Sequence, residues 1–222
     1  MRVTWYGHSC FLYEIGEKKI LIDPFLKDNP ASPIKPEDVK EADLVLVTHD
    51  HFDHLGDAVS IMKRTKAASA AVFELANWFE EQGVPGVVGA NVGGTVRFGP
   101  IGVSLVPANH SCSRGVPVGY VLTGGGDCIY HAGDTCYIAE MEYIGRRWRP
   151  TLACLPIGGH FTMDVEEAIE AALVIKPRCL IPMHYNTWSP IRVDEQAIVK
   201  LVASLQEICQ VKVMRPGETL QL

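Results

Sequence analysis

Apolar and polar positions in the first third of the chain follow the patterns of short β-strands. Three such segments predict a meander, and they cover residues 2–6, 10–14 and 18–22. The continuous apolar run at 43–48 predicts a buried central strand. Helical patterns follow at about 56–65 and 72–82, while the segment 24–41, rich in Pro, Asp and Lys, is typical of a surface loop.

The remaining two thirds repeat the order of strands followed by helices. Strands are predicted at 95–98, 101–107, 117–123, 127–131, 151–156, 178–183 and near 211–214. A helix is expected to begin near Asp164, because Asp164 and Glu167 have the spacing of a capping box, and a last helix near Asp194. Because no linker separates the halves, we predict one domain over residues 1–222 with an α/β fold, a layered sandwich whose loops meet along one edge.

Composition places the chain among soluble globular proteins. Apolar residues make up 47% of the 222 positions and charged residues 21%. No stretch approaches the roughly 18 apolar residues of a membrane-spanning helix, so no membrane partner is expected. The N-terminus lacks the pattern of a signal peptide. The seven Cys residues form no CxxC pair, which favours packing roles in a reducing compartment, and we expect a cytoplasmic location.

The charge distribution excludes one class of partner. The formal net charge is −6, and the densest basic group is Lys63, Arg64 and Lys66, which is typical of the solvated face of a helix. No cluster of Lys and Arg is long enough to follow a phosphate backbone. Binding to long nucleic acid is therefore disfavoured.

The densest chemical signal directly follows the predicted central strand. Four potential metal ligands fall within six residues: His49, His51, Asp53 and His54. Imidazole is the commonest biological metal ligand, and a carboxylate completes a site for zinc, manganese or iron. A turn at the strand end can direct His49 and His51 to one point, with Asp53 and His54 near a second. The alternative, a chance polar surface loop, is far less consistent with this density.

Three later residues supply the ligands that the motif lacks. His110, Asp134 and His184 each follow a predicted strand. A lone residue of this kind is more often structural. The repeated pattern of a strand followed by a ligand-type residue instead predicts that all three meet the motif.

These residues together resemble the metallo-β-lactamase superfamily. THDHFDH resembles its HxHxDH motif, and His110, Asp134 and His184 resemble its later ligands in the same order. The resemblance implies a four-layer αββα sandwich with two divalent metal ions, zinc first and manganese or iron as alternatives. The resemblance implies that one ion would be held by His49, His51 and His110. The other would be held by Asp53, His54 and His184, and Asp134 would bridge the two ions.

Within the superfamily, TWYGHSCF and PIGGHFTM resemble the small metal-dependent hydrolases similar to ascorbate-6-phosphate lactonase and to N-acyl-phosphatidylethanolamine phospholipase D. Related lactonases assemble into rings, so a homo-oligomer is one expectation, and the sequence does not choose a state. Flavodiiron oxygen reductases carry a Glu where this chain has His51, which disfavours electron transfer.

The hypothesis is a hydrolase in which a metal-bridged hydroxide attacks a small anionic ester, a lactone or a phosphodiester. Asp53 or Asp134 would take the proton from the attacking water. The alternatives are an iron-dependent redox or dioxygenase enzyme on the same fold, or a non-catalytic metal-binding protein. The complete ligand set argues against the last.

Two further His residues are candidates for the catalytic group. His8 lies in a predicted tight turn, where pointing into the site and bonding the local backbone are equally consistent with the sequence. His160 follows Gly158 and Gly159, which permit close approach of a ligand. A role as hydrogen-bond donor or general acid is favoured there over capping a helix.

Residues near the last two ligands are candidates for substrate binding. Arg114 can clamp a phosphate or carboxylate, and a surface position is nearly as consistent with the sequence. Tyr185, Asn186 and Trp188 follow His184 and can line the mouth of a pocket, with ordinary packing as the alternative.

Overall fold

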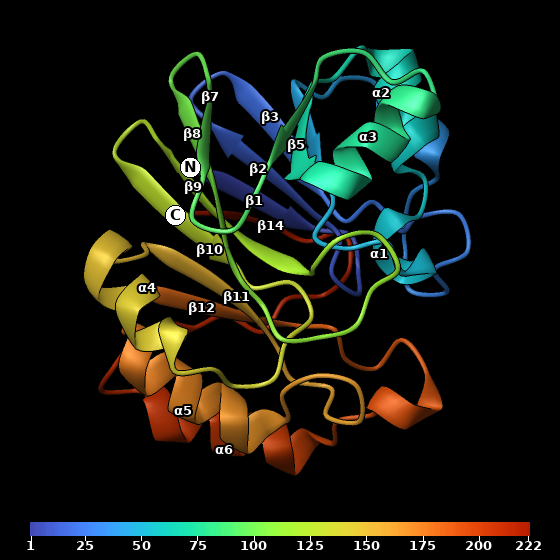
Figure 1. Cartoon of the computed structure of the whole chain (residues 1–222). Coiled ribbons are helices and arrows are strands. Elements are labelled where there is room, and N and C mark those ends of the chain that lie inside the picture. Colours follow the sequence, from blue (N-terminus) through green and yellow to red (C-terminus); the bar gives the residue numbers. More distant parts are fainter.

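The computed structural model describes residues 1–222 and has two β-sheets packed face to face, with helices outside each (Figure 1). The five-stranded sheet has the order β14-β1-β2-β3-β4, and the seven-stranded sheet the order β13-β12-β11-β10-β9-β8-β7. This arrangement confirms the expected α/β fold and its four-layer αββα sandwich.

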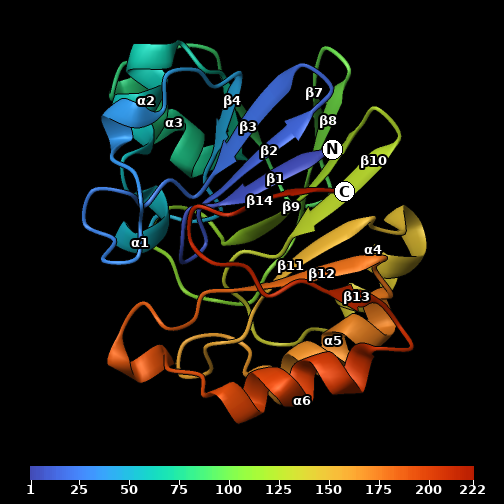
Figure 2. The same cartoon turned by 180° about the vertical axis from the view of Figure 1, so that it is seen from behind.

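The five-stranded sheet joins the two ends of the chain. Its strands are β1 (Arg2–Trp5), β2 (Phe11–Ile15), β3 (Lys18–Ile22), β4 (Leu44–Leu46) and β14 (Thr219–Gln221). All neighbours are antiparallel except β3 and β4. Because Arg2 pairs with Gln221, the N- and C-termini lie side by side (Figure 2).

The seven-stranded sheet changes from antiparallel to parallel pairing at β10. Its strands are β7 (Thr95–Phe98), β8 (Ile101–Pro107), β9 (Val118–Gly124), β10 (Asp127–His131), β11 (Leu152–Pro156), β12 (Cys179–Met183) and β13 (Gln210–Val211). From β7 to β10 the neighbours are antiparallel, and from β10 to β13 they are parallel. Parallel strands end at one edge of a sheet, which is where two of the predicted ligands follow them.

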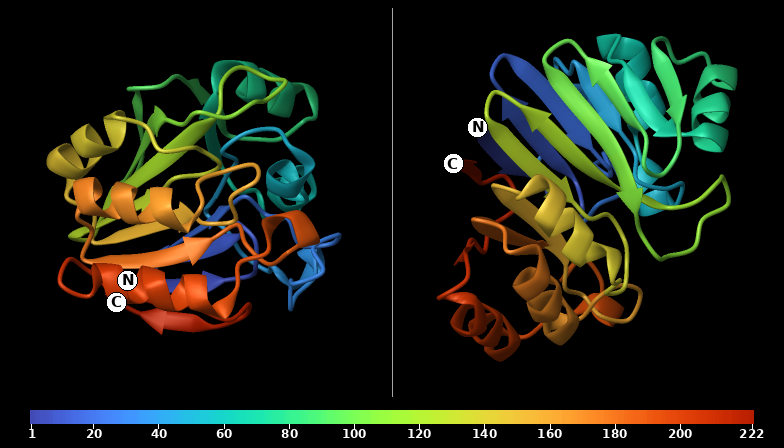
Figure 3. Two further views of the ribbon diagram at one scale, coloured as in Figure 1. Left: turned by 90° about the horizontal axis from the view of Figure 1, so that it is seen from below. Right: turned by 60° about the vertical axis from the view of Figure 1, so that its left-hand side comes forward.

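Helices cover the outer faces of both sheets. On the first sheet lie α1 (Phe52–Leu55), α2 (Ala58–Thr65) and α3 (Phe73–Glu81), with the small parallel pair β5 (Ser69–Val72) and β6 (Val87–Ala90). On the second lie α4 (Glu140–Trp148), α5 (Val165–Ile175) and α6 (Glu195–Leu205), coloured yellow to red in Figure 3. Short 3-10 turns occupy Pro36–Asp38 and Ser189–Ile191. No helix has both the length and the apolar character needed to span a membrane.

The helix starts predicted near Asp164 and Asp194 are confirmed, and an aspartate caps each helix. The side chain of Asp164 accepts a hydrogen bond from the Glu167 amide at 2.9 Å, and that of Asp194 accepts one from the Ala197 amide at 2.8 Å. Each carboxylate satisfies an amide that the first helical turn leaves free and lies at the positive end of the helix dipole.

Five elements were not predicted: α1, α4, β5, β6 and β14. The sequence of β5, Ser-Ala-Ala-Val, has little β-propensity, and β14 has only three residues. Helix α4 contains Gly145, where an added Cβ would lie 2.5 Å from the carbonyl oxygen of Ile175. That glycine weakens the helical pattern but permits close packing against the end of α5.

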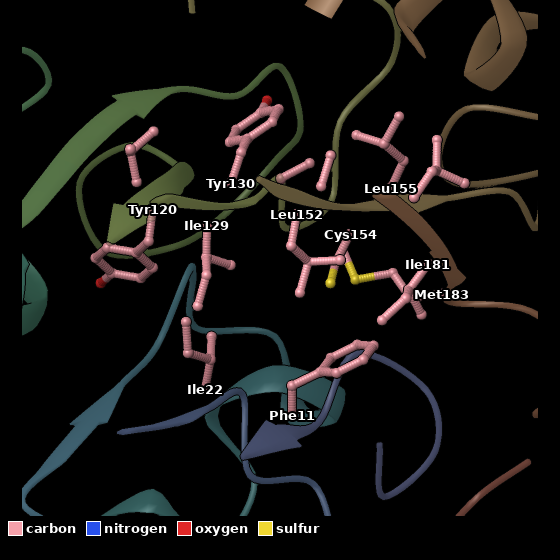
Figure 4. Close-up of a cluster of buried hydrophobic side chains, with 14 of the residues drawn as sticks. Phe11, Ile22, Tyr120, Ile129, Tyr130, Leu152, Cys154, Leu155, Ile181 and Met183 are labelled. Carbon is pink, nitrogen blue, oxygen red and sulfur yellow. The ribbon is translucent and has the colours of Figure 1, made fainter. Parts of the chain in front are cut away.

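The core between the sheets follows from the period of two along each strand. Phe11 and Ile22 of the first sheet face Ile129 and Leu152 of the second, as Figure 4 shows. Leu21, which lies between Ile20 and Ile22 on β3, points to the opposite face of the sheet, into the smaller core under α2 and α3. Truncation of a fully buried Phe to Ala costs roughly 3–5 kcal/mol, so this double core holds the strand ends, and the loops that follow them, in place.

Candidate metal centre

The predicted ligands all lie just beyond strand ends at one edge of the sandwich. The motif residues follow β4, with Asp53 and His54 in α1, and the later three follow β8, β10 and β12. Figure 1 shows these loops gathered near α1. Gly133 lies in the turn between β10 and Asp134, where the backbone passes close to Thr48. Its φ is +65°, and an added Cβ would lie 2.9 Å from Cβ of Thr48. Asp134 can therefore approach the motif because residue 133 has no side chain.

Three groups of donor atoms are close enough for each group to hold one cation. Within each group the ligand atoms lie within 4.8 Å of one another. The groups are His49, His51 and His110; His8, Asp53, His54 and His184; and His49, His54 and Asp134. The structure thus places the motif residues around two neighbouring points, as the sequence predicted, and adds His8 to the second.

Asp134 lies between these two points. Its Oδ1 is 3.2 Å from Nε2 of His54, while its Oδ2 is 3.0 Å from Nε2 of His184 and 3.6 Å from Nε2 of His110. One carboxylate thus reaches ligands of both groups.

Several buried polar atoms at the centre have no hydrogen-bond partner. They include Nε2 of His54, Oδ1 of Asp134 and Nε2 of His184. Buried polar atoms in folded proteins are almost always satisfied by hydrogen bonds, waters or ions. Because the unsatisfied atoms are imidazole nitrogens and a carboxylate oxygen that converge, the residues present fit divalent cations.

A buried carboxylate behind the centre orients two of these imidazoles. Asp23 accepts hydrogen bonds from Nδ1 of His54 at 2.7 Å and from the amide and hydroxyl of Thr48, each at 2.8 Å. Because the Thr48 hydroxyl donates to Asp23, it accepts from Nδ1 of His49 at 3.1 Å. This network assigns the proton of both rings to Nδ1, so that each Nε2 directs a lone pair toward the centre. Nε2 of His49 also accepts a hydrogen bond from Nδ1 of His51 at 3.0 Å.

The ionisation of the centre follows from burial and from the neighbouring charges. Burial and the adjacent His54 lower the pKa of His49 to about 3, so His49 is neutral at pH 7. Burial alone would lower the pKa of His54, but the carboxylates of Asp134 and Asp23 raise it well above its usual range. Burial would raise the pKa of Asp134, but His54 and His184 hold it well below. Because an imidazole that binds a metal must be neutral, cation binding at His54 would release a proton held on its Nε2.

His8 points into the centre, which decides between the two roles left open by the sequence. Its side chain is fully buried, and its ring centroid lies 4.0 Å from that of His184. Nε2 lies 3.1 Å from Oδ2 of Asp53, and Nδ1 lies 2.8 Å from the hydroxyl of Thr187. Because an ionised carboxylate only accepts, Nε2 donates to Asp53 and Nδ1 accepts from Thr187.

Arg114 lies outside the cavity, contrary to the expectation of a substrate clamp. Its guanidinium donates to Oδ2 of Asp50 at 2.7 Å and stacks 4.6 Å over the ring of Trp78. Asp50 also accepts from the Ser113 amide at 2.7 Å. The guanidinium therefore ties the loop carrying His110 to the loop after β4, and its charge is already paired.

Three other candidates also lie away from the cavity. The ring of Tyr185 stacks on Trp5 at 5.7 Å between centroids, and Oδ1 of Asn186 accepts from the Val193 amide at 2.8 Å. Both perform the packing and turn roles named as the alternative. His160 is exposed, contacts Phe161 and does not line the cavity. The adjacent Phe161 lines the cavity at the place where His160 was expected.

The cavity over the centre has a volume of about 470 Å³. Its lining combines residues of the centre with a set of apolar side chains, and consists of His51, Phe52, Asp53, His110, Ser111, Asp134, Phe161, His184, Trp188, Pro190 and Ile191. Trp188 lines it as expected. The position directly above the candidate ligands makes this cavity the candidate substrate pocket.

Sequence reasoning missed two residues behind the centre, Asp23 and His131. Nε2 of His131 lies 3.5 Å from Asp23, and its Nδ1 is hydrogen-bonded to the hydroxyl of Tyr13 at 2.9 Å. The signal was present, since Asp23 directly follows the apolar strand 18–22, as Asp134 follows 127–131.

Comparisons with known proteins find relatives over most or all of the chain. The family model described as "Beta-lactamase superfamily domain" matches residues 18–185. A protein of Caldivirga maquilingensis named "UPF0173 metal-dependent hydrolase" is 46% identical over 99% of this chain and 97% of its own, and one of Pyrococcus furiosus with the same family name is 47% identical over all of both chains. The solved structure of Igni18, a metallo hydrolase from Ignicoccus hospitalis, has a TM-score of 0.92 at 40% identity, covering 100% of this chain and 98% of the other.

Proposed function

This chain belongs to the beta-lactamase superfamily and, within it, to the UPF0173 metal-dependent hydrolases, and we propose that it hydrolyses an ester-type bond at a centre of two divalent cations. The observation that carries the proposal is the position of Asp134. It lies within 3.6 Å of imidazole nitrogens from both donor groups. Asp134 can therefore join two metal sites into one centre.

We propose the following ligand sets, which the geometry and the lone pairs support. One cation would be held by His49, His51 and His110 and the other by Asp53, His54 and His184, and Asp134 would be shared by both. Imidazole and carboxylate ligands without thiolate suit zinc, and also manganese or iron. We propose zinc.

Cations bound there would polarise the oxygen of the scissile bond and provide a nucleophile from water at neutral pH. The protein's own groups control position and proton transfer. Asp23 fixes the ring of His54, and His8 fixes the carboxylate of Asp53. Asp53 or Asp134 takes the proton from the attacking water, and both carboxylates are ionised because neighbouring imidazoles keep their pKa values low despite burial.

The expectation of an anionic substrate depended on Arg114, which does not line the cavity. Arg114 is paired with Asp50, and no Lys or Arg lines the cavity. We therefore propose an ester or lactone carbonyl as the reacting group and place phosphodiesters second. We also propose a cytoplasmic location, which seven free cysteines support.

The test is a metal count combined with an activity assay. Metal-stripped protein is reloaded with zinc or manganese, and the bound metal is measured by inductively coupled plasma mass spectrometry. We expect about two ions per chain, with binding in His110→Ala and in His184→Ala reduced to one. Hydrolysis of chromogenic esters should require both bound ions. Full activity in the stripped protein, or in Asp134→Ala, would overturn the proposal. Visible absorption that bleaches on reduction would instead identify a redox di-iron site.

A further inference from the structure

The cavity over the candidate metal centre is lined by polar residues of the centre on one part and by apolar side chains on the rest. Phe52 is 69% exposed and Phe161 is 54% exposed, values high for large aromatic side chains. Both line the cavity, together with Trp188, Pro190 and Ile191. The Phe52 and Trp188 ring centroids lie 5.8 Å apart, so these two rings form one continuous wall. We call the five residues the apolar rim.

The rim is held in place from below. The ring of Phe25, which is 3% exposed, contacts Phe52 edge-on at 5.8 Å and Trp188 at 5.9 Å between centroids. Trp188 also contacts the fully buried His8 at 4.9 Å. Because these supports are buried, Phe52 and Trp188 present fixed apolar surface to a ligand.

The lining provides almost no polar partner for a substrate outside the centre. Apart from the proposed metal ligands, the only side chains with polar atoms that line the cavity are Ser111, with its hydroxyl, and Trp188, with its indole N–H. A sugar has several hydroxyl groups, which lose their hydrogen bonds to water when they enter such a site. A phosphate or carboxylate group would find no Lys or Arg in the lining.

We propose that the substrate is an uncharged ester or lactone that carries an alkyl or aryl group, with this group bound against the apolar rim. The proposal rests on the hydrolase function argued above and narrows it to one substrate class. The oxygen of water adds to the carbonyl carbon and the carbon–oxygen ester bond breaks. A proton of that water passes to the alcohol oxygen, which leaves an acid and an alcohol.

Binding energy in this site comes from apolar contact at the rim, and the reacting carbonyl lies at the centre. Apolar burial contributes about 25 cal/mol per Å². Losing one ring face therefore weakens binding of an aryl group by a factor of about ten. Because the rim contacts the group beside the reacting bond, its truncation raises KM for apolar substrates and changes KM little for polar ones.

The experiment compares three substrates on zinc-loaded protein. Dihydrocoumarin is an uncharged aromatic lactone, glucono-δ-lactone is a polyhydroxylated one, and bis(4-nitrophenyl) phosphate is an anionic diester. We expect dihydrocoumarin to have the highest kcat/KM, and Phe161→Ala and Trp188→Ala each to raise its KM about tenfold. Phe73→Ala is the matched control, because Phe73 is 55% exposed but lies on α3, outside the cavity.

A binding measurement separates failure of this inference from failure of the proposed hydrolase. Chroman, which has the rings of dihydrocoumarin without its carbonyl, is titrated and followed by saturation-transfer NMR. We expect binding to the native protein and to Phe73→Ala, and a loss of about tenfold in Phe161→Ala. Preference for gluconolactone or the phosphodiester, or chroman binding unchanged in both rim variants, overturns the inference even where hydrolysis occurs. If none of the three substrates is hydrolysed but chroman binds through the rim, the ester-hydrolase proposal fails, while the binding of an apolar group at the rim stands.

Discussion

Nε2 of His8 lies 3.1 Å from Oδ2 of Asp53, although 45 positions separate the two residues in the chain. His8 has a φ of +56°, a left-handed conformation that is rare for a residue with a Cβ. His184, whose amide donates to the carbonyl of His8, has a φ of +54°. Such strain persists where the surrounding structure imposes it and is concentrated at functional sites. The β1–β2 turn is therefore part of the centre.

We predict that His8→Ala weakens cation binding at the Asp53 side of the centre by about 10–100-fold, the usual effect of losing a residue that orients a ligand. Asp53 would lose its hydrogen-bond donor and become free to rotate. Isothermal titration with zinc measures the affinity, and His8→Gln should recover part of it because an amide can still donate. His160→Gln should be without effect on binding and on kcat. A hundredfold loss of kcat in His160→Gln would restore the general-acid role expected from the sequence.

For Arg114→Gln, we predict a loss of about 1–3 kcal/mol in the free energy of unfolding. The side chain of Asp50 is 1% exposed and would lose its charged partner. Urea denaturation measures the change. The comparison variant is Arg2→Gln, because Arg2 pairs with Glu14 at the surface and such pairs contribute little. If Arg114 were a substrate clamp, its loss would raise KM for anionic esters alone. We instead expect Arg114→Gln to change KM equally for charged and uncharged esters.

A third prediction concerns Asp23. Asp23→Asn removes the negative charge that holds the proton of His54 on Nδ1, and we expect zinc affinity to fall about 10–100-fold. Tyr13→Phe removes the hydroxyl bonded to His131 and Cys154 but leaves Asp23 in place. It should lower stability and leave zinc affinity within a factor of about two. Equal losses of affinity in both variants would mean that the network acts only through packing.

Sequence reasoning located the candidate ligands because their signals are local. The motif residues are adjacent in the chain, and each later ligand follows a predicted strand, so the fold class and strand-end rule were enough to group them. The same rule applies to Asp23, which directly follows the predicted strand 18–22 and precedes the loop 24–41, yet this residue was not singled out.

The wrong predictions, for Arg114 and His160, concern positions where the sequence does not show which partner a side chain contacts or which of two adjacent residues faces the cavity. Arg114 lies four residues past His110, and nothing in the sequence shows that Asp50, rather than a ligand, takes its charge. His160 and Phe161 are adjacent, and the backbone conformation of the turn decided which one faces the cavity: the φ of His160 is +26°. Such choices depend on the packing of distant segments.

We predict that metal removal lowers the melting temperature substantially. A ligand at 1,000 times its dissociation constant stabilises the folded state by about 4 kcal/mol, which corresponds to roughly 10 °C for a domain of this size. Scanning calorimetry with and without a chelator measures the difference. Asp134→Ala should lose most of this stabilisation by zinc. An equal gain in the native protein and in Asp134→Ala would place the bound zinc outside this centre.

The stability of the metal-free protein should depend on pH through His8. Burial and the neighbouring His184 lower the pKa of His8 to about 4, against 6.5 for an exposed imidazole. The unfolded chain therefore binds more protons between these values, so the contribution of His8 is complete above pH 6.5 and is lost as pH falls toward 4.

The shift corresponds to about 3 kcal/mol at most. Asp53, whose pKa His8 helps to keep low, titrates below this window in the folded protein. The difference between native protein and His8→Gln thus isolates the imidazole. Urea denaturation in chelator at pH 7, 5.5 and 4 should show a shallower loss of stability in His8→Gln. A parallel decline in both proteins would show that His8 is not held neutral in the folded state.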